Sequence, residues 1–295
     1  QLVLDAQDKT FPEFMKETVF KPLGMKNSTY RQPLPEHLQT EAASGHRPNA
    51  MPLDGKWHVY PEMAPAGLWS TSADIAAFVA DIQLAYKKNK GKLLSQKMAK
   101  KYLAPFISDS MGLGFFIMEK NGSAYFNHSG GNEGFQAFVI AHRDNGYGAV
   151  VLTNSDRGSQ LYDEIIRGLA SIYNWQHYLS KPYEPIQLKS QLMEPFAGKY
   201  HVDSGHILEI KFFAGKLFAR NTFERRVEIV PIAQNKFVRT DKDVVYQFVR
   251  DPGSKTVTHL LEHTAGKTVK REVKPADFTV PGELLIAGRL PEAIE

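Results

Sequence analysis

The segment HSGGNEGF, residues 128–135, is the stretch on which the fold assignment depends. It begins at the end of residues 124–128, which have the composition of a strand. Glycines in or beside a strand indicate that the backbone approaches another group closely, because a side chain there would block the approach. Taken alone, residues 128–131 fit equally well a glycine-rich turn that carries a surface histidine, so the surrounding sequence has to decide between the two interpretations.

The residues on both sides of this segment predict an antiparallel sheet. The dipeptide Asn-Gly at 121–122 is a strong signal for a two-residue hairpin. An apolar stripe after Asp156 predicts a helix that closes the sheet, with Leu161, Ile165, Ile166, Leu169 and Ile172 on one face. The four expected strands are 114–119, 124–128, 135–141 and 148–153.

Helices and one long irregular segment precede the sheet. A capped helix is expected to begin near Thr10, a second one at residues 71–74 and a shorter third one after Ser95. Residues 26–66 hold many Pro, Gly, Asn and Ser residues and show little periodicity, which is typical of a functional loop or an ordered cover.

The last third of the chain predicts a separate all-β domain. Residues 181–185, KPYEP, have the composition of a linker. Eight β segments with turn residues at intervals of roughly ten residues then indicate a small sandwich or an up-and-down barrel. The eight segments are 198–202, 207–213, 216–220, 227–231, 236–239, 244–249, 256–261 and 268–273. The predicted fold class is therefore α/β (α+β), divided into a first domain at 1–178, a linker at 179–195, a β domain at 196–280 and a tail at 281–295.

The composition excludes several classes of protein. The chain has 295 residues and a net charge of +4, and its basic and acidic residues are interspersed, so no nucleic-acid partner is expected. The absence of cysteine excludes disulfides, thiolate catalysis and cysteine-ligated zinc. His259 and His263 are four residues apart in a region of predicted strand and turn, so neither a metal nor another cofactor is predicted. No apolar run is long enough to predict a transmembrane segment.

The first residues, QLVLD at 1–5, have neither an initiator Met nor the pattern of a signal peptide. They have the composition of the middle of a helix. We therefore expect the chain to be the C-terminal part of a longer protein.

Four landmarks in a fixed order resemble the serine β-lactamase-like family, which includes class C β-lactamases, penicillin-binding proteins, D-stereospecific peptidases and related esterases. The landmarks are FKPLGMKNS at 20–28, AGLWSTSAD at 66–74, GLGF at 112–115, and HSGG at 128–131 with GF at 134–135. The resemblance covers residues 1 to about 178, and residues 196–274 are similar to the lipocalin-like barrel that many family members carry.

The resemblance implies roles for the glycine-rich segment. It places His128-Ser129-Gly130 on the third active-site motif of the family, with His128 as a catalytic residue and Ser129 and Gly130 in support. By the same resemblance the backbone N–H of Gly131 contributes to the oxyanion hole.

The family's nucleophile motif, Ser-x-x-Lys, does not occur at any serine of this sequence. The tripeptide Tyr125-Phe126-Asn127 has the form of the second motif, but it directly precedes the third motif on the same strand and does not fit the family spacing. Both missing motifs are therefore expected upstream of Gln1, and the chain alone is expected to be inactive. Ser129 is not expected to replace the nucleophile, because neighbours in a strand point to opposite faces.

Three aromatic residues, Trp57, Tyr60 and Trp69, lie in or near the long irregular segment. They are candidates for the rim of a substrate pocket, and packing under a cover is the alternative.

Two functions remain open from the sequence. The first is a serine hydrolase acting on a β-lactam, a D-amino-acid peptide or a carboxylic ester, with a small molecule or a peptide as the substrate. The second is a non-catalytic binding or scaffold protein whose barrel holds a small apolar ligand or a partner. The resemblance also suggests a bacterial periplasmic or exported protein, and association with the upstream segment or with further copies of the chain.

Overall fold

The computed structural model of the chain describes residues 9–106, 108–120, 122–179, 182–251, 253, 256–264 and 267–289, apart from the side chain of Gln160. The chain divides into two compact units, Gln1–Leu179 and Ser180–Glu295. Four features expected from the sequence lie at least partly outside the described residues: the helix at 1–5, Asn121 of the first hairpin signal, Lys181 of the linker and residues 290–295 of the tail.

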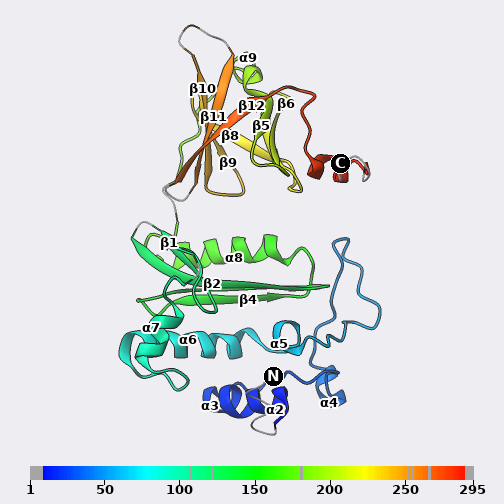
Figure 1. Cartoon of the computed structure of the whole chain (residues 1–295), viewed down its shortest axis with the longest axis vertical. Coiled ribbons are helices and arrows are strands. Elements are labelled where there is room, and N and C mark those ends of the chain that lie inside the picture. The colour runs from blue at the N-terminus through cyan, green and yellow to red at the C-terminus, as the bar shows by residue number, and fades with distance from the viewer. Residues whose placement is uncertain are drawn as a thin grey trace. The chain divides into compact units, whose positions relative to one another are not determined.

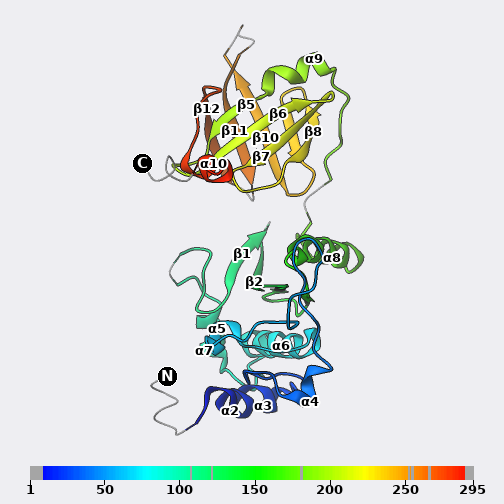
Figure 2. The same cartoon turned by 90° about the vertical axis from the view of Figure 1, so that its right-hand side faces the viewer.

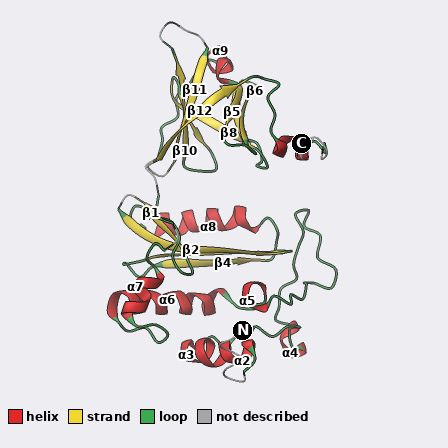
Figure 3. Cartoon of the chain, viewed as in Figure 1, coloured by secondary structure: helices red, strands yellow, loops and turns green. Residues whose placement is uncertain are grey.

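The first unit contains a four-stranded antiparallel sheet in the order β1-β2-β3-β4 (Figure 1). Its strands are β1 (Phe116–Lys120), β2 (Ser123–Asn132), β3 (Phe135–His142) and β4 (Gly148–Thr153). Helix α6 (Ser72–Lys88) covers one face and helix α8 (Gly158–Ile172) covers the other (Figure 3). The predicted antiparallel sheet with a closing helix is confirmed.

Strand β2 is longer than the sequence indicated. It continues through the glycine-rich segment to Asn132, and every residue from Tyr125 to Asn132 has a partner on β3. The segment at 128–131 therefore lies within a strand rather than at its end. Pairing with the apolar strand β3 holds these glycines in the sheet although glycine itself disfavours strands.

Separate apolar clusters lie on the two faces of the sheet. On the face toward α6, the cluster includes Ile82, Phe115 and Phe126. On the face toward α8, it includes Tyr125 and Ile166. The expected apolar stripe of α8 is only partly buried, because Leu161, Ile165 and Ile172 are exposed.

The N-terminal landmarks are joined by a hydrogen-bonded link. Thr71 caps α6 by accepting from the N–H of Asp74, as the sequence predicted. The buried carboxylate of Asp74 accepts from the N–H of Asn27 and from the hydroxyl of Ser28, each at 2.8 Å. The landmarks at 20–28 and 66–74 thus meet at the start of α6.

The remaining helices of this unit are short. They are α2 (Phe11–Met15), the π-helical segment η1 (Lys16–Phe20), α3 (Lys21–Leu23), α4 (Glu36–Gln39), α5 (Met63–Ala66) and α7 (Gln96–Tyr102). The expected helix starts at Thr10 and Ser95 are confirmed, because both side chains cap the helix that follows. None of the described helices combines the length and the apolar character that crossing a bilayer requires.

The second unit is a closed eight-stranded antiparallel barrel (Figure 2). The strands are β5 (Gly198–His201), β6 (Ile207–Phe213), β7 (Lys216–Asn221), β8 (Val227–Ala233), β9 (Lys236–Arg239), β10 (Val244–Arg250), β11 (Val257–Thr264) and β12 (Lys267–Lys274). Each strand coincides with a predicted β segment to within three residues at either end. Of the two predicted architectures, the barrel is confirmed.

The segments on either side of the barrel contain helices that the sequence did not indicate. Helices α9 (Ser190–Met193) and η2 (Glu194–Phe196) lie at the end of the predicted linker, and Phe196 packs into the barrel core. Helix α10 (Pro281–Ile286) occupies the start of the predicted tail. An ion pair of 2.8 Å between Glu283 and Arg220 fastens α10 to β7.

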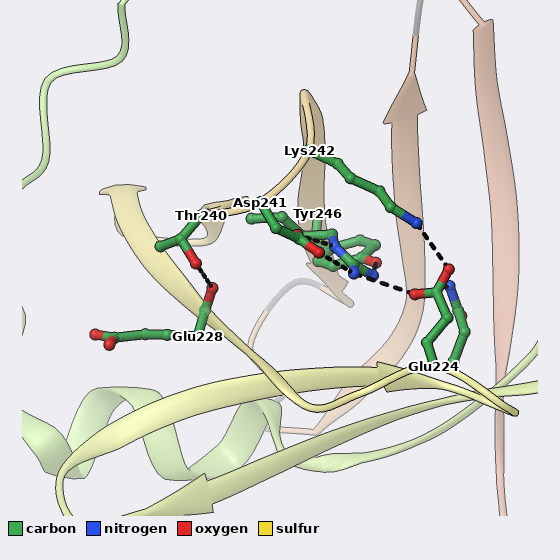
Figure 4. Close-up of polar contacts among 8 residues, drawn as sticks. Glu224, Glu228, Thr240, Asp241, Lys242 and Tyr246 are labelled. Atoms are coloured by element: carbon green, nitrogen blue, oxygen red, sulfur yellow. Dashed lines mark hydrogen bonds and ion pairs between the residues drawn. The ribbon is translucent and has the colours of Figure 1, made fainter. Parts of the chain in front are cut away.

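The barrel contains a buried arginine held by acidic partners. Arg239 donates to both carboxylate oxygens of Asp241, at 2.9 and 3.0 Å, and lies 3.1 Å from the carboxylate of Glu224. Lys242 donates to the other oxygen of Glu224 at 2.8 Å (Figure 4). The side chain of Arg239 is only 2% exposed, so the loss of a partner would leave a buried charge uncompensated.

The acidic partners of Arg239 make the stability of the barrel dependent on pH. Burial on its own raises the pKa of Asp241, but the hydrogen bonds and the charge of Arg239 outweigh it and hold this pKa below the ordinary 3.8. Burial also acts upward on the pKa of Glu224, and the hydrogen bond from Lys242 with the charge of Arg239 holds it below 4.5. The two carboxylates therefore contribute their full stabilisation above the ordinary pKa values. This stabilisation is lost as the pH falls through the lowered pKa values.

We expect Asp241→Asn to lower the free energy of unfolding of the barrel by about 2 kcal/mol at pH 7, and the difference from the wild type to shrink below pH 4. All 3 tryptophans lie in the first unit, so a transition seen by far-UV circular dichroism and not by tryptophan fluorescence reports the barrel. Asp277→Asn, at an exposed position, is the control. Equal unfolding free energies for the two variants at pH 7 would contradict this account.

Candidate active site

The glycine-rich part of β2 has an open edge. Strand β1 pairs with β2 only from Ser123 to Asn127, whereas β3 pairs with β2 as far as Asn132. Residues 128–132 consequently have no strand partner on the β1 side within the described part of the chain. The four residues His128, Ser129, Gly130 and Gly131 are all exposed. Backbone groups on this edge are therefore accessible to a molecule in solution.

Strand alternation separates His128 from Ser129. His128 has the parity of Phe126, which packs in the cluster on the α6 face, and Ser129 has the parity of Tyr125, which packs on the α8 face. The imidazole of His128 also lies near the Phe115 ring of the α6-face cluster, with ring centroids 6.4 Å apart. His128 and Ser129 therefore do not act as a pair on one face.

The two glycines of the motif differ in their surroundings. A Cβ atom at Gly130 would have a single neighbouring atom within 4 Å, the Cβ of Ala137 at 4.0 Å. A Cβ atom at Gly131 would lie 2.9 Å from the side-chain amide of Gln136, which can move aside. Packing within the unit therefore does not require glycine at 130, and the missing side chain keeps the exposed strand accessible.

The turn after β2 is clamped by the long segment 26–66. A Cβ atom at Gly134 would lie 2.8 Å from the Cα of Gly45, and the φ of Gly134 is +82°. The N–H of Gly134 donates to Asp156 at 2.7 Å, and the N–H of Asp156 donates to the carbonyl of His46 at 3.0 Å. The close backbone approach predicted from the glycines occurs here, between two chain segments.

A polar cluster surrounds the same turn. The carboxylate of Glu133 pairs with Arg47 at 2.5 Å and with His58 at 2.8 Å. The N–H of Glu133 donates to the hydroxyl of Tyr60 at 3.3 Å. These side chains are exposed or half-buried, and together they tie the long segment to the end of β2.

The aromatic candidates lie at this end of the open edge. The rings of Trp57 and Trp69 are 5.1 Å apart, and the ring of Trp69 is 6.2 Å from that of Phe135. Trp57, Tyr60 and Trp69 are half-buried. The side chain of Asn132 donates to the carbonyl of Ala66 at 2.9 Å, which joins β2 to the segment that carries Trp69.

Tyr125 faces away from the open edge. Its side chain is fully buried, and its hydroxyl donates to the carbonyl of Gln176 at 2.7 Å. Burial, followed by the hydrogen bond with Tyr147, raises the pKa of Tyr125. Tyr125 thus serves the core toward α8, whereas Phe126 of the same tripeptide packs in the cluster on the α6 face.

One neighbour of His128 was not identified from the sequence. The ring of Phe116 lies 5.8 Å from the imidazole, and Phe116 begins β1 opposite Asn127. The contact could not be read from the sequence because it depends on the register of β1 against β2. Among the described residues, no group of His, Asp and Glu side chains is arranged to hold a metal ion.

Comparisons with known proteins found one family match and several similar solved structures. A family model described as Beta-lactamase matches residues 1–173. The SurE crystal structure is 18% identical, with 92% of this chain and 65% of that chain covered and a TM-score of 0.48. The octameric penicillin-binding protein homologue from Pyrococcus abyssi is 15% identical, with 92% and 62% covered and a TM-score of 0.49.

A D-amino acid amidase from Ochrobactrum anthropi SV3 is 19% identical, with 59% of this chain and 54% of that chain covered and a TM-score of 0.46. The chain thus spans less than two thirds of the length of each of these structures. A search of curated protein sequences found no match.

The clamp between Gly134 and Gly45 gives a test of the site's framework. We expect Gly134→Ala to lower the free energy of unfolding of the first unit by about 2–4 kcal/mol, because the methyl group meets backbone and the positive φ is strained. Tryptophan fluorescence during denaturant unfolding is the measurement.

Gly122→Ala is the matched control, because Gly122 also has a φ of +82° but has no atom within 4 Å of the added Cβ. Its cost should be about 1 kcal/mol, from the backbone alone. If the two substitutions cost the same, the close approach at Gly134 does not contribute to stability.

Proposed function

Because the chain belongs to the beta-lactamase family, a family of serine hydrolases, we propose that it is part of a serine hydrolase that works through an acyl-enzyme. The observation that carries the proposal is the open edge of β2, where four exposed residues include the two adjacent glycines. We propose that these residues are the third active-site motif of the family.

The chemistry requires positioned N–H donors. A serine oxygen attacks the substrate carbonyl carbon, the leaving group departs with a proton, and water then cleaves the acyl-serine ester to release the acid and restore the serine. Negative charge develops on the carbonyl oxygen in each step, and fixed N–H dipoles near it lower the barrier.

We assign this donor role to the backbone N–H of Gly131. The strand to which Gly131 belongs is fixed by pairing with β3 and by the clamp at Gly134, so the donor needs little reorganisation during the reaction. His128 is the proposed side chain at the same oxyanion end, and Ser129 and Gly130 support the motif. Trp57, Tyr60 and Trp69 are the proposed rim at the other end of the edge.

The serine nucleophile and the second proton-handling group are proposed to come from polypeptide outside these 295 residues. No Ser-x-x-Lys occurs in the sequence, and the chain spans less than two thirds of the structures that it resembles. The chain alone is therefore expected to have no acyl-transfer activity. Esters, amides and β-lactams share the reacting carbonyl, and all three belong in the assay.

A labelling experiment tests whether a serine hydrolase is assembled. A version of the protein that includes polypeptide preceding Gln1 should react with a fluorophosphonate or a penicillin probe, and the 295-residue chain should not. If the longer version also fails to label and to hydrolyse all three substrate classes, the hydrolase proposal is wrong and the binding function gains support.

In an active longer version, His128→Ala should lower kcat/KM by about 10²–10³, because a polar group at the oxyanion end is lost. His37→Ala, an exposed histidine on α4, is the control and should leave kcat/KM unchanged. Unfolding curves measured in parallel separate a catalytic effect from a loss of fold. Unchanged turnover in His128→Ala would refute the role of His128.

A further inference from the structure

The β1 end of the open edge carries an apolar side chain that the core does not use. Phe116 is 43% exposed, although its neighbours Phe115 and Ile117 are buried in the cluster on the α6 face. Phe116 is paired with Asn127, the last residue of β2 before the open stretch begins. An exposed aromatic ring therefore stands where the accessible backbone of β2 starts.

Phe116 also contacts the histidine of the motif. The two ring centroids are 5.8 Å apart and the ring planes are inclined by 35°. Phe115 approaches the same imidazole edge-on, at 6.4 Å and 79°. His128 thus lies near one buried and one exposed aromatic ring, and the exposed ring is free to contact a bound molecule at the same time.

The segment that presents Phe116 is closely packed and hydrogen-bonded. A Cβ atom at Gly112 would lie 2.7 Å from the carbonyl oxygen of Tyr102, and one at Gly114 would overlap the Tyr102 hydroxyl. Hydrogen bonds run from Gly112 N–H to the carbonyl of Phe115 at 2.8 Å and from Leu113 N–H to the carbonyl of Tyr102 at 3.2 Å. The GLGF landmark is therefore a turn pressed against α7.

The same turn displays a second apolar side chain, Leu113, which is 42% exposed. Exposed apolar groups on a rigid support lose little conformational entropy when they bind another apolar group. A flexible loop would lose more. The turn consequently has the properties of a preformed subsite.

We propose that Phe116, together with Leu113 of the same turn, forms an apolar subsite at the His128 end of the open edge and selects substrates that carry an aromatic or branched aliphatic group. The role of this subsite in substrate selection rests on the proposed function. The binding itself depends only on residues of this chain, so it can be measured without turnover. Phe116 acts as a specificity-determining residue and takes no part in bond making.

The test uses two uncharged amides that differ only in the side chain, N-acetyl-phenylalaninamide and N-acetyl-alaninamide. Titration of the 295-residue chain is followed by NMR at the His128 imidazole protons and the Leu113 methyl groups. We expect saturable shifts with the phenylalanine amide, binding at least about fivefold tighter than that of the alanine amide, and nuclear Overhauser contacts between the probe ring and the Phe116 ring.

Phe116→Ala should weaken binding of the phenylalanine amide about tenfold and should leave the alanine amide unchanged. Phe116→Leu keeps most of the apolar surface and should give an intermediate value, which also covers the case in which the alanine variant does not fold. Leu152→Ala is the matched control, because Leu152 is 40% exposed and lies on β4, at the other side of the sheet.

Equal affinities for the two amides, or an unchanged affinity in both Phe116 variants, would overturn the subsite. Neither result depends on whether a serine nucleophile is supplied from elsewhere. Conversely, failure of fluorophosphonate labelling together with selective binding of the phenylalanine amide would refute the proposed hydrolase function and support the subsite.

Discussion

The unequal lengths of β1 and β2 are the constraint on which the candidate site depends. Strand β1 stops pairing at Asn127, and β2 continues to Asn132 with β3 as its only strand neighbour in the described part of the chain. Backbone N–H and C=O groups that a longer β1 would have occupied are left for another molecule. The donor role proposed for the backbone N–H of Gly131 depends on that difference in length.

An N–H donor on the open edge requires a fixed backbone. Both ends of the edge are fixed by contacts between distant segments. At the far end, Gly45 and Gly134 meet through their backbones, and Glu133 binds Arg47 and His58. At the near end, the turn at 112–115 is pressed against Tyr102 of α7. The long irregular segment and the GLGF landmark thus lie at the two ends of the open edge of β2.

The sequence predicted features that depend on local pattern, and it missed those that depend on register or on distant partners. Turn residues at regular intervals located all eight barrel strands, and Thr71 located the start of α6. The extension of β2 was missed because glycines lower strand propensity and only pairing with β3 overrides it. The exposure of Ile165 was missed because periodicity shows that a stripe exists but not how much of it is covered.

The candidate site, too, could be predicted from the sequence only where it depends on local pattern. The motif at 128–131 was recognisable from its order among four landmarks, whereas Phe116 becomes its neighbour only through the pairing of β1 with β2. Strand β4 ends the sheet with the uncharged run Ala149-Val150-Val151-Leu152, which lacks the lysines and prolines that commonly shield such margins. In concentrated solution the unpaired edge of β4 can therefore pair with a strand of another molecule and extend the sheet. This edge lies on the opposite side of the sheet from the open edge of β2, where chemistry is proposed.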